Sequence, residues 1–252
     1  MNVPARKVAV ALPVVLTILI AIVIGGLVIV QDQRQSHQVE EAEEVAQTYL
    51  AQVDAFRSSI IAKVDKADAS DPGALSKVLD RAMAGPPRLG GAPAYGREHS
   101  ASYAEAAQTE ATVLRPFKRL SATLRRADIS LTFITAARKV LELRATDYVG
   151  YGFITTSTRV RSELIPAFVK ARDAFDRVPV PKGQEELAAK VHDAAQYVID
   201  QASVLAARID SRQNFSFSYQ DEFQAVAEAI NDYATRVKGD VAEAVAEVTA
   251  DS

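Results

Sequence analysis

The sequence predicts an all-α protein in which one N-terminal transmembrane helix continues into an antiparallel helical bundle outside the cytoplasm. Three features predict this fold. The run from Val8 to Val30 contains no charged residue. Apolar residues then recur at alternating intervals of three and four along most of the chain, whereas glycine and proline concentrate in the stretch 71–96. This spacing is typical of amphipathic helices, which glycine and proline interrupt.

The uncharged run is long enough to cross a membrane. As a helix it would span about 34 Å, more than the roughly 30 Å of a hydrocarbon core. A cleaved signal peptide has a shorter apolar core and a small-x-small cleavage site, and no good site of that kind lies near the end of this run. Because the chain has no cysteine, a thiol-linked lipid anchor is excluded. We therefore expect an uncleaved signal anchor that includes Val8, Leu12, Leu16, Leu19, Val23, Leu27 and Val30.

The charges beside the anchor predict its orientation. Arg6 and Lys7 precede the apolar run, and only Arg34 lies close after it, followed by the acidic stretch 40–44. Lys and Arg are enriched on the cytoplasmic side of such spans. We therefore expect residues 1–7 in the cytoplasm, 8–30 in the cell membrane, and a domain of residues 31–252 on the periplasmic or cell-envelope side.

Composition narrows the possible functions. A formal net charge of −3 and a sequence pI near 5.7 give no support for a nucleic-acid partner. The absence of cysteine removes disulfides, thiol catalysis and cysteine-ligated zinc, haem or iron–sulfur centres. We expect neither a cofactor nor a metal. The high content of alanine, valine and arginine suits a bacterium with a GC-rich genome.

Beyond the anchor, the pattern first predicts a stalk and short helices. Apolar residues over 39–60 form one stripe without glycine or proline, so the anchor should continue as a stalk to about Asp68. A short helix is expected over 72–82, and Ser102 with Glu105 predicts a capping box that opens another. The Gly/Pro-rich segment 85–99 is expected to be a long loop.

The longer helices follow. We expect them over 117–147, 160–178, 184–212 and 219–249, with a kink at Pro166 in the second. Apart from the kinked helix, these have nearly the same length as the stalk. Equal rods joined by turns are typical of antiparallel bundles. The sequence therefore predicts one domain of four to five long helices plus short ones.

No pattern in the chain predicts catalysis. Its three histidines, His37, His99 and His192, fall in the predicted stalk, the loop and a helix, and none belongs to a catalytic motif. His99 could bind a metal, but a solvated loop histidine is the simpler interpretation. Clustered acidic residues, and the basic run from Arg115 to Arg126, are most simply solvated helix faces. An acidic partner surface is the alternative for the basic run.

Two predicted turns are unusual because they are aromatic. Following the rods up and down places both at the membrane end of the bundle, where they could contact a partner or the membrane interface. Two alternatives remain open: the rings could close the end of the core, or segments 152–156 and 214–218 could pair as a β ribbon. The candidate contact residues are Tyr148, Tyr151, Phe153, Phe215, Phe217 and Tyr219.

These features favour a non-enzymatic interaction protein. We expect an accessory or scaffolding subunit of a larger bacterial membrane or envelope complex, such as a respiratory or envelope-building one, with the membrane and other subunits as partners. The alternative is a ligand- or lipid-binding helical sensor or carrier tethered to the outer face of the membrane, because an apolar groove between helices leaves no motif. A membrane-tethered enzyme is a third, weaker hypothesis.

Overall fold

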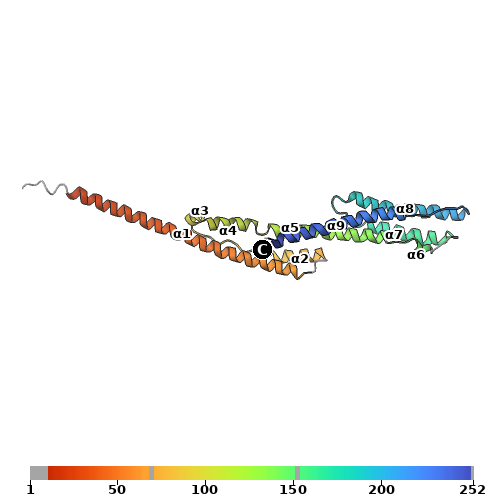
Figure 1. Ribbon diagram of the computed structural model, residues 1–252, viewed down its shortest axis with the longest axis horizontal. Helices are drawn as coiled ribbons and strands as arrows, with labels where there is room; N and C mark the ends of the chain where they lie inside the picture. Colours follow the sequence, from red (N-terminus) through yellow and green to blue (C-terminus); the bar gives the residue numbers. More distant parts are fainter. Residues whose placement is uncertain (1–10, 68–70, 151–153, 251–252) are drawn as a thin grey trace, which may run out of the picture. The chain divides into compact units, whose positions relative to one another are not determined.

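The computed structural model describes residues 11–67, 71–150 and 154–250, with side chains over 33–67, 71–150 and 154–249 (Figure 1). Every regular element in this part of the chain is a helix, which confirms the all-α prediction. In chain order the elements are α1 (Ala11–Asp65), α2 (Pro72–Ala82), α3 (Ala94–His99), α4 (Ala101–Thr112), α5 (Arg115–Leu141), α6 (Thr146–Val149), the π-helix η1 (Val160–Leu164), α7 (Ile165–Phe175), α8 (Glu185–Asp210) and α9 (Gln220–Ala250).

The helices form two compact units where the sequence predicts one bundle. Unit 1 comprises residues 1–60 and 83–115, and unit 2 comprises residues 61–82 and 116–252. The stripe on the predicted stalk is buried within unit 1, against short helices. The long helices of unit 2 have a separate core.

The predicted anchor, 8–30, lies outside the residues whose side chains are described, although the backbone of α1 is helical from Ala11 onward. Among the described residues, no helix combines the length and the apolar character needed to cross a bilayer.

Unit 1 is held together by small side chains at a close helix contact. Gly96 of α3 lies against α1, and a Cβ atom there would come within 2.0 Å of the Gln38 carbonyl oxygen and 2.9 Å of the Ala42 Cβ. Further along α1, Tyr49 packs with Ala106 and Val113 in the unit 1 core. Only glycine permits the close approach of α3 to α1.

The start of α4 differs from the prediction. Ser100, not Ser102, is the N-cap, and its Oγ accepts a hydrogen bond from the Tyr103 N–H at 3.1 Å. Serine is a good cap at either position, but the backbone at Ser100 is extended, as an N-cap requires. The capping-box prediction is therefore wrong by two residues. A short helix of six residues, α3, lies inside the segment predicted to be a loop.

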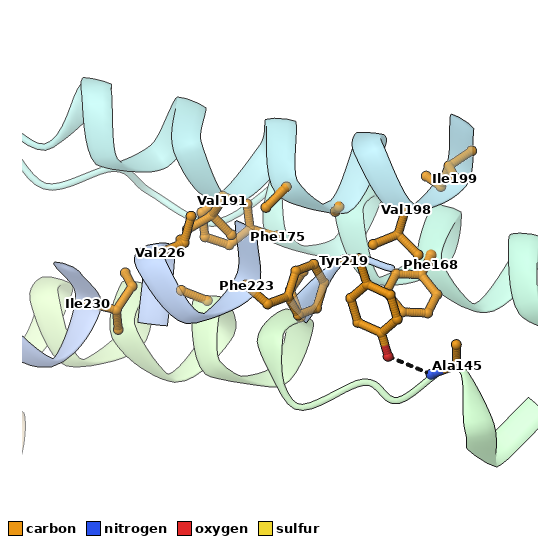
Figure 2. Close-up of a cluster of buried hydrophobic side chains, with 14 of the residues drawn as sticks. Ala145, Phe168, Phe175, Val191, Val198, Ile199, Tyr219, Phe223, Val226 and Ile230 are labelled. Atoms are coloured by element: carbon orange, nitrogen blue, oxygen red, sulfur yellow. Dashed lines mark hydrogen bonds between the residues drawn. The ribbon is translucent and has the colours of Figure 1, made fainter. Parts of the chain in front are cut away.

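Unit 2 contains a bundle of α5, α7, α8 and α9, with α2 packed on α5. Aromatic rings fill the bundle core where helices meet: Phe133 lies 5.4 Å from Phe175, and Phe168 lies 6.1 Å from Phe223, between ring centroids. Figure 2 shows Phe168, Phe175 and Phe223 between the helices, with valine and isoleucine side chains around them. Aromatic pairs in this geometry stabilise a core by more than the burial of their apolar area alone provides.

A polar cluster joins α2 to α5. The Ser121 hydroxyl donates to the Asp80 carboxylate at 2.7 Å, and Arg125 donates to the other carboxylate oxygen at 2.5 Å. These hydrogen bonds, from Arg125 first and then Ser121, lower the pKa of Asp80. A charged carboxylate with two donors therefore holds the short helix against the long one.

The predicted irregularity at Pro166 is present in another form. The π-helix Val160–Leu164 immediately precedes α7, and Pro166 lies in the first turn of α7. Because proline has no N–H and its ring crowds the preceding turn, a wider π turn relieves the conflict. By contrast, Gly239 does not interrupt α9, which continues to Ala250.

Candidate functional site

The two aromatic turns meet at one end of the unit 2 bundle. The Tyr219 hydroxyl accepts a hydrogen bond from the backbone N–H of Ala145 at 2.8 Å (Figure 2). Tyr219 is only 7% exposed, and its ring centroid lies 5.6 Å from that of Phe217. The described parts of both turns therefore lie at the same end of the bundle, whereas their predicted position at the membrane end stays a prediction. The N-terminal half of α5, where α2 packs, lies at the opposite end of this bundle.

The candidate contact residues occupy different environments. Tyr219 belongs to the core, whereas Phe215, Phe217 and Tyr148 are half-buried and pack against it. Tyr151 and Phe153 lie outside the described residues. Residues 154–156 and 214–218 form no strand, so they do not make the suggested β ribbon. The described rings thus pack in or against the core at this end of the bundle.

Polar contacts hold the same end together. Asp210, at the end of α8, accepts hydrogen bonds from Ser157 and, at 2.6 Å, from Arg161. These two donors lower the pKa of Asp210, the hydrogen bond from Ser157 having the larger effect. They tie the segment before α7 to the end of α8, which orients the turns. A small cavity of about 380 Å³ lies between Ile154, Phe217 and their neighbours.

A groove lies between α5 and α7, and we call it the α5/α7 groove. Its volume is about 830 Å³, within the roughly 300–1,000 Å³ typical of small-molecule sites. Cα atoms of α5 and α7 seldom approach within 8 Å, unlike those of α7 and α8. The lining residues are Asp128, Leu131, Thr132, Thr135, Ala136, Lys139, Val140, Leu143, Tyr148, Ala167, Lys170, Ala171, Ala174, Phe175 and Val178.

Short side chains leave this groove open. Ala167, Ala171 and Ala174 lie on one face of α7, and Thr132, Thr135 and Ala136 lie opposite on α5. None of these side chains reaches across the gap. Leu131 at the rim is 37% exposed, and the buried side chains of Val140 and Phe175 also line the groove. An open apolar channel therefore lies along the surface of unit 2.

Charged side chains lie at two levels along the length of the groove. Lys139 and Lys170 line one part, and neither forms an ion pair within the described part of the chain. Asp128 lies about 16 Å along α5 from Lys139 at 1.5 Å per residue. Its carboxylate is beside Gly73 of α2, where a Cβ atom would lie 2.7 Å from it. The groove is thus positive at the level of Lys139 and Lys170 and negative at its α2 end, and the section between these two levels is apolar.

The histidines do not assemble a site. His37 pairs with Glu40 on α1, His99 stacks on Tyr95 with ring centroids 3.9 Å apart, and His192 contacts Asp176 at 3.0 Å. Among the described residues, no three His, Asp or Glu side chains could share a metal ion.

The basic run on α5 is partly neutralised within unit 2. Arg119 pairs with Glu247 at 3.0 Å and Arg125 with Asp80 at 2.5 Å. Both pairs are substantially exposed, so their contribution to stability is small. Two of the five basic residues of the run are therefore already engaged by acidic groups of the same unit.

Sequence reasoning did not locate the α5/α7 groove. The alanines of α7 read as part of an ordinary amphipathic stripe, because small residues are equally typical of close helix packing. The sequence does contain a pattern that indicates the groove. Short side chains recur at helical spacing on both α5 and α7, and a lysine lies beside them on each helix. Recognising it requires knowing that these two helices face each other.

Comparison with family models, with curated proteins and with solved structures finds no match for this chain.

Proposed function

We propose that this chain is a non-enzymatic interaction protein, anchored in the cell membrane by its N-terminal apolar run, with residues 31–252 outside the cytoplasm. In this proposal it serves as an accessory or scaffolding subunit of a bacterial membrane or envelope complex. Its partners are the membrane and other subunits of that complex.

The observation that carries this proposal is the continuity of α1. This 55-residue helix runs without interruption from Ala11 to Asp65, so the apolar run and the buried stripe of unit 1 share one helix. An anchor built this way would keep unit 1 near the membrane, where neighbouring membrane proteins are accessible.

Reporter fusions test the topology. A reporter enzyme active only outside the cytoplasm, fused after Ser252, should be active and remain with the membrane fraction. The matched control carries Leu19→Arg with Val23→Arg, which places two charges in the apolar run, at a cost of about 2.5–3.5 kcal/mol each near the centre of a span. This control should lose reporter activity. Activity of a cytoplasm-specific reporter in the unmodified chain would overturn the proposed orientation.

Purification from native membranes in mild detergent tests the interaction. A stable assembly larger than the chain itself supports the proposal, and recovery as a lone monomer contradicts it. Phe215→Ser with Phe217→Ser then separates two roles of the aromatic end. Loss of partners with unchanged thermal unfolding indicates a contact surface, whereas loss of stability indicates that the rings serve only the core.

The α5/α7 groove favours a second candidate function, binding of an apolar ligand by the tethered domain. An open groove of about 830 Å³ with an apolar lining is suited to a ligand that is itself largely apolar. Ala171→Phe, which puts a ring into the groove, should abolish such binding. Binding that is unchanged in this variant would exclude the groove as the site.

A further inference from the structure

We infer that the α5/α7 groove binds a single-chain amphiphile with an anionic head, the head held between Lys139 and Lys170 and the chain directed toward Leu131 and Val178. This inference rests on the ligand-binding function proposed above and names the chemical class of the ligand. It is carried by the groove's apolar lining and by the placement of its charges.

The two lysines face the same level of the groove. Phe133 of α5 contacts Phe175 at the end of α7, whereas Tyr148, after α5, shares the groove with Ala167 near the start of α7. The helices are therefore antiparallel. Lys139 lies about 9 Å beyond Phe133 along its helix, and Lys170 lies about 8 Å before Phe175, at 1.5 Å per residue. The two ammonium groups can thus act on one ligand group from both walls.

The lysines are available to an anion. Both side chains are exposed, and neither has a carboxylate partner in the described part of the chain. Two like charges across an open groove repel each other, so an anion between them relieves that repulsion as well as pairing with each. Lysine suits this role because its flexible apolar stem can follow the groove wall while the ammonium reaches the ligand.

The remainder of the groove suits an alkyl chain. Between the level of the lysines and Asp128, the walls present Leu131, Phe175 and Val178 with alanine and threonine side chains between them. This part extends about 12 Å along α5 from Lys139 to Leu131. Burial of each methylene of the chain adds to the affinity, because apolar surface leaves water. The apolar section therefore supplies affinity, and the lysines supply orientation.

Asp128 sets the direction of the ligand. Its carboxylate lies at the α2 end of the groove, beside Gly73. An anionic head placed there would be repelled, whereas the uncharged end of a chain would not. The charge pattern therefore keeps the anionic head away from the α2 end and leaves that end to the chain.

Photo-crosslinking of the full chain in nanodiscs of zwitterionic lipid tests the inference. The probe is a palmitic acid analogue with a diazirine in its chain and a terminal alkyne. The matched probes are the corresponding alcohol and the corresponding amine. Labelled peptides are quantified by mass spectrometry. The acid should label peptides covering 131–143 and 167–178 about tenfold more than the alcohol, the difference expected from two partly exposed ion pairs. The amine should label them least.

Lys139→Gln with Lys170→Gln removes both charges and leaves polar side chains that are only one atom shorter. In this variant, labelling by the acid should fall to the level of the alcohol. Lys77→Gln with Lys238→Gln removes the same charge from lysines that do not line the groove, and labelling should be unchanged. Circular dichroism of both variants checks that helical content is retained.

The outcomes separate the two proposals. If acid and alcohol label the groove equally in the unmodified chain as well as in the lysine variants, but Ala171→Phe abolishes both signals, the groove binds apolar ligands and the inferred anionic class is wrong. Preference for the amine would also overturn the inference. If no probe labels the groove peptides above the Ala171→Phe background, the ligand-binding function itself is wrong.

Discussion

Alanine and valine side chains around Tyr49 make up the buried core of unit 1, whereas several aromatic rings fill the core of unit 2. In unit 1, Gly96, Ala42 and Ala46 let helices approach closely. In unit 2, Phe133, Phe168 and their neighbours occupy the space between the helices. Helices are thus stabilised by close backbone contact in one unit and by large buried rings in the other. Added atoms should damage unit 1, and removed atoms should damage unit 2.

Removing a ring from unit 2 should have the largest effect. Phe168 is fully buried and contacts Tyr219 and Phe223. Phe168→Ala should lower the free energy of unfolding by about 3–5 kcal/mol, because it leaves a cavity as well as losing burial. Denaturant unfolding and hydrogen exchange over α7 and α8 measure the loss. Phe215→Ala, at a half-buried ring, is the matched control and should cost much less. Equal losses would contradict the importance assigned to the core rings.

Adding a methyl group to unit 1 should have the next largest effect. Gly96→Ala would place its Cβ 2.0 Å from the Gln38 carbonyl oxygen, so the backbone must shift, at a cost of about 1–3 kcal/mol or more. Hydrogen exchange over 42–53 and 101–113 should accelerate. Gly239→Ala is the control, because its Cβ meets no atom within 4 Å; alanine in that helix should stabilise by up to about 1 kcal/mol. Unchanged exchange in the Gly96 variant would argue against close contact between α3 and α1.

Paired tyrosine substitutions sharpen the comparison further. The Tyr219 hydroxyl accepts the buried Ala145 N–H, so Tyr219→Phe should destabilise unit 2 by about 1 kcal/mol or somewhat more. The buried Tyr49 hydroxyl in unit 1 has no hydrogen-bond partner among the described residues. Tyr49→Phe should therefore be neutral or stabilise by up to about 1 kcal/mol. Thermal unfolding of the two variants measures this difference in sign. Destabilisation by Tyr49→Phe would show that the Tyr49 hydroxyl has a hydrogen-bond partner in solution.

The smallest expected effect concerns pH. Hydrogen bonds from Arg125 and Ser121 lower the pKa of Asp80 in the folded chain. The stabilisation from this carboxylate is therefore present above the ordinary Asp pKa of about 3.9 and is lost as pH falls through the lowered folded value. Asp80→Asn should reduce the stability of unit 2 modestly at neutral pH, and the difference from the unmodified chain should shrink in acid. A difference that grew in acid would contradict this assignment. Hydrogen exchange in unit 1 should not change.

Helix positions were largely predictable because they depend on local pattern. The helices predicted over 184–212 and 219–249 are observed over 185–210 and 220–250. The errors occur where several local signals compete. Ser100 and Ser102 are both acceptable caps, and only the backbone conformation selects Ser100. Pro166 signalled an irregularity, but whether it becomes a kink or a π turn depends on packing around it.

The candidate sites were less predictable because they depend on which helices face each other. The prediction that both aromatic turns lie at the membrane end followed the helices up and down one bundle. It assumed that the stalk is the first helix of that bundle. The apolar stripe of the stalk instead packs against α4 in unit 1. The alternation of helix directions therefore no longer supports a position at the membrane end. The meeting of the two turns was predictable from their connection through neighbouring helices, whereas the pairing of Tyr219 with Ala145 was not.

The amino-acid sequence by itself determined that the described chain is helical, where most of its helices run and which residues face inward, because helix periodicity is a property of consecutive residues. It also predicts the apolar anchor and the absence of thiol chemistry. Only the tertiary structure decided that the helices form two units and that α5 and α7 leave a groove between Lys139 and Lys170. An apolar stripe specifies that a face must be buried, but the partner that buries it is selected by the shape and size of side chains far away in the sequence.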